Sequence, residues 1–343
     1  MPASFRQLIA HNLQSQHPVL DLGQSELTEL PPELAGMHWL RELTLSHNRI
    51  RDLRPLHQLP QLQVLDLMHT DVEDLSPLSA LTHLDTLTLS ATPVANLTPL
   101  ASLPALQTLY ASHTAVSDLT PLASLPALQA LFQMHTPVTD LAPLAQLASL
   151  QQLYLMHTAV ADLQPLASLV RLQALYLMHT RVRDLAPLAG LHGLEVLSLA
   201  ATRVADLAPL AHLPQLQSLS LNNTAVDDLT PLAGMATLRT LNLSSTKVAG
   251  LAPLANCLAL QSLDLRSSCA SDASVLARLP LLRIRGALNQ GVSYSWLPTP
   301  PARAALLQKL DPNTIWAVLV TALNGSLSHG GGGTLPGQTR TQY

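Results

Sequence analysis

Aromatic residues are scarce in this chain. Phe, Trp and Tyr together make up 3% of the 343 residues, although 48% of the chain is hydrophobic. A buried core must therefore be built from leucine and alanine, which is unusual for a globular enzyme of this length.

Charge is also sparse. Charged residues make up 12% of the chain and the net charge is −4, so no basic surface is available to neutralise a row of phosphates. We therefore expect no nucleic-acid partner. Of the basic residues only Lys247 and Lys309 are lysines. This preference for Arg, together with the abundance of Ala, is typical of a GC-rich bacterial genome and predicts a bacterial source.

The N-terminal residues 1–16 lack a basic segment followed by an apolar stretch, and no uncharged apolar run reaches about 18 residues. We expect a soluble, cytoplasmic protein without a membrane partner, with injection into a host cell as an open alternative. The two cysteines, Cys257 and Cys269, are too few for a disulfide framework, and we expect Cys257 to be a reduced core residue.

The abundant leucine is arranged in a repeat. It recurs every 22 residues, at positions 40, 62, 84, 106, 128, 150, 172, 194, 216, 238 and 260. The unit reads LxxLxLxxTxVxDLxPLAxLxx, a related unit starts at Leu20, and a shortened last strand is expected at 282–284. Fixed self-similarity of this kind predicts a solenoid of stacked units.

The central LxLxx of each unit alternates as a short strand does, so Leu65 and Leu67 point inward while Asp66 and Met68 point outward. A single unit cannot bury its own leucines. Stacking the units does, and each buried leucine contributes roughly 1.5 to 3 kcal/mol. Stability therefore accumulates from one repeat to the next.

The rest of the unit predicts a turn. Threonine recurs nine times from Thr70 to Thr246, which suggests a ladder of hydroxyls bonded to the backbone. Proline from Pro55 to Pro253 suits the first residue of a tight helical turn. The repeated aspartates are read as turn and cap residues: Asp74, Asp118, Asp140, Asp162, Asp184 and Asp206. The predicted fold is an α/β solenoid, a curved horseshoe with a parallel sheet on its concave face and short helical turns on its convex face.

The two ends differ in composition from the repeats. Residues 1–17 are expected to form an N-terminal helical cap, with a helix over 4–14, and 18–285 to form the solenoid. Residues 286–325 are expected to form a C-terminal helical cap with helices at 302–310 and 312–324, followed by a disordered tail at 326–343.

The repeat resembles the 22-residue leucine-rich repeats of bacterial internalins and of a regulatory subunit of protein phosphatase 1. DLxPLAxLxxL is the most specific segment, and the resemblance covers about residues 20–285. Threonine largely replaces the family's usual asparagine, which leaves the turn bonding open. The opening LTELPPEL segment is also similar to repeats attached to Roco-type GTPases, but no GxxxxGK[ST] motif follows, so GTPase activity is not implied.

The third, fifth, seventh and eighth residues of each unit face the concave side and are free to vary. Three sets of residues recur there: Tyr110, Phe132, Tyr154 and Tyr176 in four consecutive units; Met68, Met134, Met156 and Met178; His69, His113, His135, His157 and His179. With strands about 4.8 Å apart, the aromatic column runs about 15 Å. We expect an exposed apolar patch that contacts a partner, and the resemblance to internalins implies the same role for concave aromatics.

Two other interpretations of the patch stay open. The segments 153–158 and 175–180 are identical (LYLMHT), so recent duplication alone could explain the pattern. The patch could also serve self-association. Beyond it, a neutral polar strip either extends the contact or stays hydrated: Ser220, Asn222, Asn223, Asn242, Ser244 and Ser245.

We expect no metal and no cofactor. A straight ladder of histidines points its rings parallel rather than toward one ion, and no acidic or cysteine ligand joins it. Hydrogen bonding to a partner, with some pH sensitivity, is the expected role of the imidazoles.

No GxSxG elbow or Gly-rich phosphate loop is present, and the C-terminal 60 residues show no nucleophile with a plausible base. The sequence therefore predicts a monomeric, non-enzymatic scaffold that binds a protein or peptide on its concave face. The alternatives are a regulatory or targeting subunit of a separate enzyme such as a phosphatase, or a bacterial effector injected into a host cell.

Overall fold

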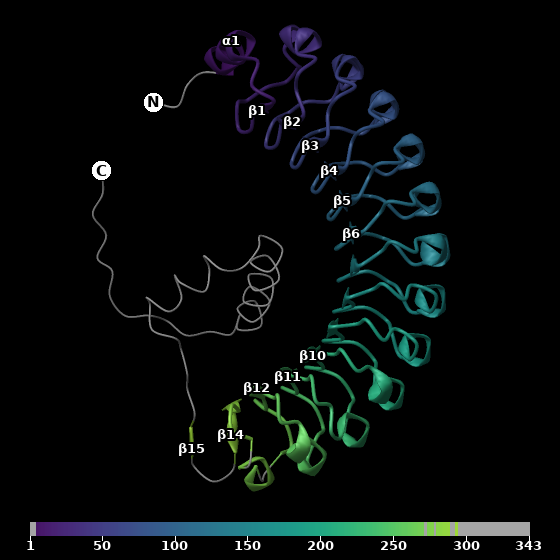
Figure 1. Ribbon diagram of the computed structural model, residues 1–343, viewed down its shortest axis with the longest axis vertical. Helices are drawn as coiled ribbons and strands as arrows, with labels where there is room; N and C mark the ends of the chain where they lie inside the picture. The colour runs from purple at the N-terminus through teal and green to yellow at the C-terminus, as the bar shows by residue number, and fades with distance from the viewer. Residues whose placement is uncertain (1–4, 271–272, 278, 289–291, 294–343) are drawn as a thin grey trace, which may run out of the picture. The chain divides into compact units, whose positions relative to one another are not determined.

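The computed structural model describes residues 5–270, 273–277, 279–288 and 292–293. The predicted solenoid is confirmed: thirteen strands pair in parallel and in chain order within one open sheet (Figure 1). The strands are β1 (Val19–Asp21), β2 (Glu42–Thr44), β3 (Val64–Asp66), β4 (Thr86–Thr88), β5 (Thr108–Tyr110), β6 (Ala130–Phe132), β7 (Gln152–Tyr154), β8 (Ala174–Tyr176), β9 (Val196–Ser198), β10 (Ser218–Ser220), β11 (Thr240–Asn242), β12 (Ser262–Asp264) and β13 (Arg283–Arg285).

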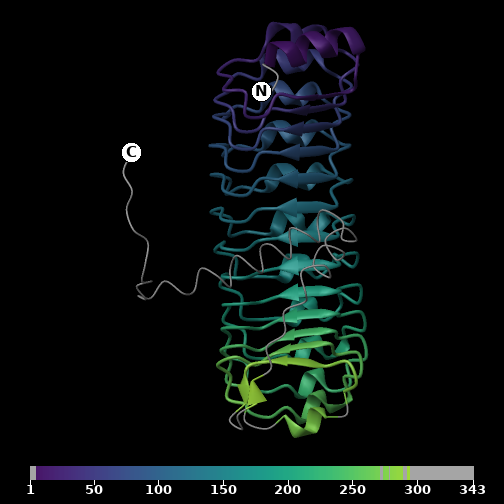
Figure 2. The same ribbon diagram turned by 90° about the vertical axis from the view of Figure 1, so that its left-hand side faces the viewer.

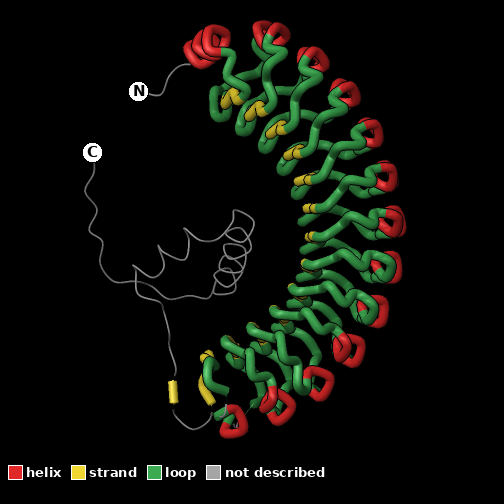
Figure 3. The backbone as a smooth tube through the Cα atoms, in the orientation of Figure 1, coloured by secondary structure: helices red, strands yellow, loops and turns green. Residues whose placement is uncertain are grey.

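The predicted helical turns are 3-10 helices. They lie on the outer side of the arc while the strands lie on its inner side (Figure 3). A proline stands in the first turn of each of the first eleven, as expected. They are η1 (Pro32–Gly36), η2 (Arg54–Gln58), η3 (Ser76–Ala80), η4 (Thr98–Ser102), η5 (Thr120–Ser124), η6 (Ala142–Gln146), η7 (Gln164–Leu166), η8 (Ala186–Leu188), η9 (Ala208–His212), η10 (Thr230–Leu232), η11 (Ala252–Asn256) and η12 (Ser274–Leu276).

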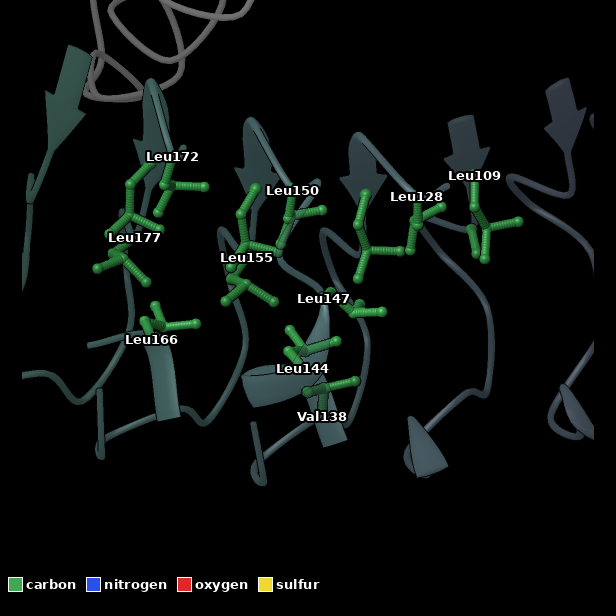
Figure 4. Close-up of a cluster of buried hydrophobic side chains, with 14 of the residues drawn as sticks. Leu109, Leu128, Val138, Leu144, Leu147, Leu150, Leu155, Leu166, Leu172 and Leu177 are labelled. Atoms are coloured by element: carbon green, nitrogen blue, oxygen red, sulfur yellow. The ribbon is translucent and has the colours of Figure 1, made fainter. Parts of the chain in front are cut away.

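The constant repeat length aligns equivalent residues on neighbouring strands. Leu131 pairs with Leu153 and Leu153 with Leu175, and the strands stack in one column when seen from the side (Figure 2). The strand leucines meet those of the outer turns in one continuous core, part of which Figure 4 shows between Leu109 and Leu177. Cys257 is a free, buried member of this core, as predicted.

The hydroxyl ladder is also confirmed. Thr158 Oγ1 donates to the Leu155 carbonyl at 2.7 Å, and the other eight threonines make the same bond to the carbonyl three residues earlier. Asn48, which precedes the ladder, reaches further: its Nδ2 donates to Leu22 and Leu45 carbonyls, and its Oδ1 accepts from the Leu27 amide. Asparagine therefore ties adjacent units together, whereas threonine closes only its own turn.

The core has one irregularity. At the sixth position, where the other ten units carry leucine or alanine, Gln133 is fully buried. Neither its Oε1 nor its Nε2 forms a hydrogen bond within the described chain. In the preceding unit, Ala111 occupies the equivalent position, directly after β5. A buried amide without partners costs stability, so this segment is less well satisfied than the units around it.

Helix α1 (Phe5–Ser15) lies against β1. Its Ile9 enters the core, and Trp39 Nε1 donates to Asn12 Oδ1 at 2.9 Å. After β13 the chain forms a short antiparallel pair, β14 (Ala287–Leu288) and β15 (Val292–Ser293), which the repeat pattern does not predict. The helices expected at 302–310 and 312–324 and the tail at 326–343 lie outside the described residues, and the domain limits stay predictions. No helix within the described ranges is long and apolar enough to cross a membrane.

Because Leu153 is fully buried in the middle of the array, we expect Leu153→Ala to lower the free energy of unfolding by about 2 to 5 kcal/mol. Arg171→Ala, an exposed change close by, should alter it by less than about 0.5 kcal/mol. Urea denaturation of both variants measures the difference. Equal losses would show that the leucine does not carry the packing assigned to it.

Candidate functional site

The aromatic column lies on β5 to β8, where Tyr110, Phe132, Tyr154 and Tyr176 are direct strand partners. Successive ring centroids are 4.3, 4.2 and 4.4 Å apart, with interplanar angles of 21°, 14° and 8°. The rings are therefore stacked face on face along the sheet.

This stacking corrects the expectation of an exposed aromatic surface. Phe132 and Tyr154 are only 7% and 8% exposed, because each has a ring against both of its faces. Burial raises the pKa of the Tyr110 and Tyr176 hydroxyls, and in Tyr176 a hydrogen bond with Tyr154 partly offsets the rise. Tyr110 and Tyr176, at the two ends of the column, are half-buried, and the stacked ring faces hold neighbouring repeats together.

The methionines differ in accessibility. Met156 is 3% exposed and belongs to the buried set, which again corrects the expectation of exposure. Met68, Met134 and Met178 are half-buried. The accessible thioethers next to the aromatic column are thus those of Met134 and Met178, on either side of Met156.

The histidines form two stacks of parallel rings, as predicted. In His113, His135, His157 and His179 the centroids are 4.3, 4.1 and 4.3 Å apart, with interplanar angles of 16°, 12° and 13°. His47 and His69 stack separately at 4.6 Å, because Ala91 interrupts the column. Rings in this arrangement cannot converge on one ion, and no group of three or more His, Cys, Asp or Glu in the described ranges is placed to hold a metal.

A backbone constraint that the sequence analysis did not identify lies under the histidine column. The eighth residue has positive φ in every unit from Gln24 to Ser267, for example 57° at His157, 53° at Ala201 and 58° at Asn223. Histidine and asparagine tolerate this left-handed conformation better than most residues. In the sequence, this conformation is indicated by the recurrence of His, Asn, Ser and Ala at the eighth position. The histidines therefore have a role in the turn besides any contact with a partner.

Stacking also changes the protonation of the inner imidazoles. Burial, followed by the neighbouring histidines, lowers the pKa of His157 from 6.5 to about 4 and lowers that of His135. Both rings therefore stay neutral at pH 7, able to donate from one nitrogen and accept at the other. His135 and His157 therefore become protonated at a lower pH than an ordinary histidine does.

The polar strip satisfies much of its own hydrogen bonding. Ser220 Oγ lies 2.7 Å from Asn222 Oδ1, and Asn242 Nδ2 donates to the same oxygen at 3.3 Å. Ser244 bonds to Asn242 as well. The repeated aspartates are turn residues as predicted: Asp162 Oδ1, for instance, accepts the Gln164 amide at 2.8 Å, far from the strands.

Comparison with known proteins agrees with this geometry. A family model of paired leucine-rich repeats matches residues 38–79 and 192–234. A crystal structure of internalin C2 from Listeria monocytogenes is 34% identical, with 55% of this chain and 83% of that chain covered and a TM-score of 0.52. The chain is a leucine-rich-repeat protein. No curated protein matches it in sequence.

Two further structures share the fold of this leucine-rich-repeat protein. One is another internalin from Listeria monocytogenes, with 23% identity, 86% of this chain and 99% of that chain covered, and a TM-score of 0.70. The other is the leucine-rich-repeat ectodomain of a plant membrane receptor kinase from Arabidopsis thaliana in complex with Casparian strip integrity factor 2. It has 21% identity, 78% of this chain and 38% of that chain covered, and a TM-score of 0.63.

The positive φ at the eighth position yields a stability prediction. Ala201→Gly should raise the free energy of unfolding by about 0.5 to 1 kcal/mol, because glycine adopts φ 53° without the strain of a Cβ. Ala200→Gly, one residue earlier and outside this conformation, should lower it through lost backbone entropy and packing. Thermal or urea denaturation of the pair checks the opposite signs.

The histidine stack yields a pH prediction. Between about pH 6.5 and 4 the unfolded chain takes up a proton at residue 157 while the folded protein does not, so stability should fall as the pH drops through this range. Above pH 6.5 this group contributes no pH dependence. His157→Asn, which suits the left-handed backbone, should flatten the profile measured by urea denaturation at several pH values. An unchanged slope in the variant would contradict the assignment.

Proposed function

We propose that this leucine-rich-repeat protein is a non-enzymatic scaffold that binds a protein partner through its concave patch. The concave patch consists of the aromatic, methionine and histidine columns: Tyr110, Phe132, Tyr154, Tyr176, Met68, Met134, Met156, Met178, His69, His113, His135, His157 and His179. Among its fold neighbours, the plant receptor ectodomain was solved in complex with Casparian strip integrity factor 2, which supports a binding role for this fold.

The observation that carries the proposal is that the fold does not require these side chains. At the fifth position, Thr88 and Ser198 directly flank the aromatic column and form strands as regular as those of Tyr110 and Tyr176. At the seventh position, Ser112 and Asn222 take the place of methionine. Apolar residues concentrated in neighbouring units, where polar ones fold equally well, favour a contact surface.

The stacking suits such a surface because it preorganises the patch. Phe132 and Tyr154 are already fixed between two rings, and Tyr110 and Tyr176 each stack on one, so little side-chain entropy is lost when a partner orders them. The accessible Met134 and Met178 thioethers adapt in shape, and the neutral imidazoles and tyrosine hydroxyls supply hydrogen-bonding groups.

A regulatory or targeting subunit of a separate enzyme, and an effector injected into a host cell, would both use the patch in the same way. We further propose that the protein acts as a monomer, without cofactor or nucleic acid, and that it is bacterial and cytoplasmic. Self-association through the patch is the competing use.

The test places charges on the accessible part of the patch. Met134→Glu with Met178→Glu should weaken a partner's binding about 30-fold or more, equivalent to about 2 kcal/mol, because two carboxylates would be desolvated against an apolar contact. The fold should tolerate the change, since Arg266 occupies the same position in another unit. Affinity purification with mass spectrometry identifies the partner, and calorimetry measures the affinity.

The matched control is Ala161→Glu with Ala205→Glu, which adds the same charge at exposed loop positions where another unit carries Glu73. It should leave the affinity unchanged. If both double variants lose the partner equally, or both retain it, the partner binds somewhere other than the patch. Sedimentation of the free protein as a dimer that the patch variant dissociates would favour self-association instead.

A further inference from the structure

Charge is distributed unevenly along the concave face. At the third, fifth, seventh and eighth positions of the units, no Asp, Glu, Lys or Arg occurs between Thr86 and Ser245. This uncharged stretch spans β4 to β11 and includes most of the concave patch. The charges that adjoin it, Asp85, Glu195 and Arg239, come one residue before strands begin and so stand at the rim.

The N-terminal end of the face is acidic. Asp21 on β1 and Glu42 on β2 are exposed, and Asp66 on β3 is half-buried. Asp21 Oδ1 and Asp66 Oδ1 each accept a backbone amide, from Gly23 and Met68 at 2.9 Å, but none of the three carboxylates forms an ion pair within the described residues. None of β1, β2 and β3 contains a Lys or Arg residue, and Arg41 comes one residue before β2.

The other end of the face is different. Asp264 on β12 is paired with Arg266, whose guanidinium lies 2.7 Å from the carboxylate and donates to both of its oxygens. This pair largely neutralises itself, but β13 adds Arg283 and Arg285 at the third and fifth positions, and both are exposed. The face therefore runs from an acidic end without ion pairs, through a long uncharged middle, to an end with a net positive charge.

Such a face selects the charge pattern of what it binds. A charged residue of the partner placed over the middle would lose its hydration without gaining a counter-charge, which is costly. A lysine or arginine placed over β1 to β3 would instead meet the unpaired carboxylates. The distance from β3 to β5, the first strand of the aromatic column, is two strand spacings, or about 10 Å.

We propose that the partner contributes a polypeptide segment with an uncharged, apolar part that covers β5 to β8 and one or more Lys or Arg residues that lie over β1 to β3. The segment has one orientation on the sheet, because its cationic end matches only one end of the face. This inference rests on the proposed function and adds the chemistry and the direction of the partner.

A phage-displayed library of random linear peptides, selected on the full chain, provides the probe. The selected peptides should combine an apolar, uncharged part with Lys or Arg toward one end. Glu42→Gln with Asp66→Asn should weaken them about five-fold and reduce the salt dependence of binding, since two attractions between opposite charges are removed. Asparagine at 66 keeps the acceptor that the Met68 amide uses.

The matched control is Asp184→Asn with Asp206→Asn, which changes the net charge equally but on the outer turns, where Asn96 already occupies the equivalent position. Peptides should bind this control as they bind the unchanged protein. Equal weakening by both double variants would show a general charge effect and overturn the inference.

The patch variant Met134→Glu with Met178→Glu separates the two proposals. Suppose that the selected peptides no longer bind this variant, but carry no Lys or Arg and bind the Glu42→Gln, Asp66→Asn variant as well as the unchanged protein. That result would overturn the inference and leave the proposed function standing. Peptides insensitive to the patch variant, or a library that yields no binder, would overturn both.

Discussion

The structure depends on one constraint, the unbroken spacing of 22 residues that places each leucine beside the same leucine of the next unit. A leucine cluster from a single unit would remain open to water on both sides. In register, each unit closes the core of the one before it, and the hydroxyl ladder and 3-10 turns repeat with the same period. At the two ends the outer turns absorb a change of one residue in this spacing, because Leu20 still pairs with Leu43 and Leu263 with Ile284.

Register also explains why the candidate surface is partly structural. Any side chain repeated at one position is brought about a strand spacing from its copies, so aromatic and imidazole rings must stack. Stacking withdraws the faces of Phe132 and Tyr154 from solvent and depresses the basicity of His157. The side chains proposed as a contact surface therefore also hold adjacent repeats together, so truncating them would lower stability whatever they bind.

The least satisfied part of the core lies directly beneath this surface. Gln133 follows Phe132 on β6 and points its unpaired amide into the position where other units bury leucine. The buried amide lowers the stability of the units in which the aromatic, methionine and histidine columns all occur. Departures from local consistency of this kind concentrate at functional sites, which agrees with the placement of the concave patch.

The sequence by itself determined the fold, since a period of 22 with alternating leucines admits only a stacked parallel sheet with short outer turns. It also determined which side chains share the concave face, because strand alternation decides that locally. Only the tertiary structure decided how accessible those side chains are: Met156 is buried while Met134 is not, and Tyr154 is covered by its neighbours. Accessibility, ring contacts and the shifted pKa of His157 arise between repeats, from distances of about 4 Å that depend on how the units stack, and a linear pattern does not contain those distances.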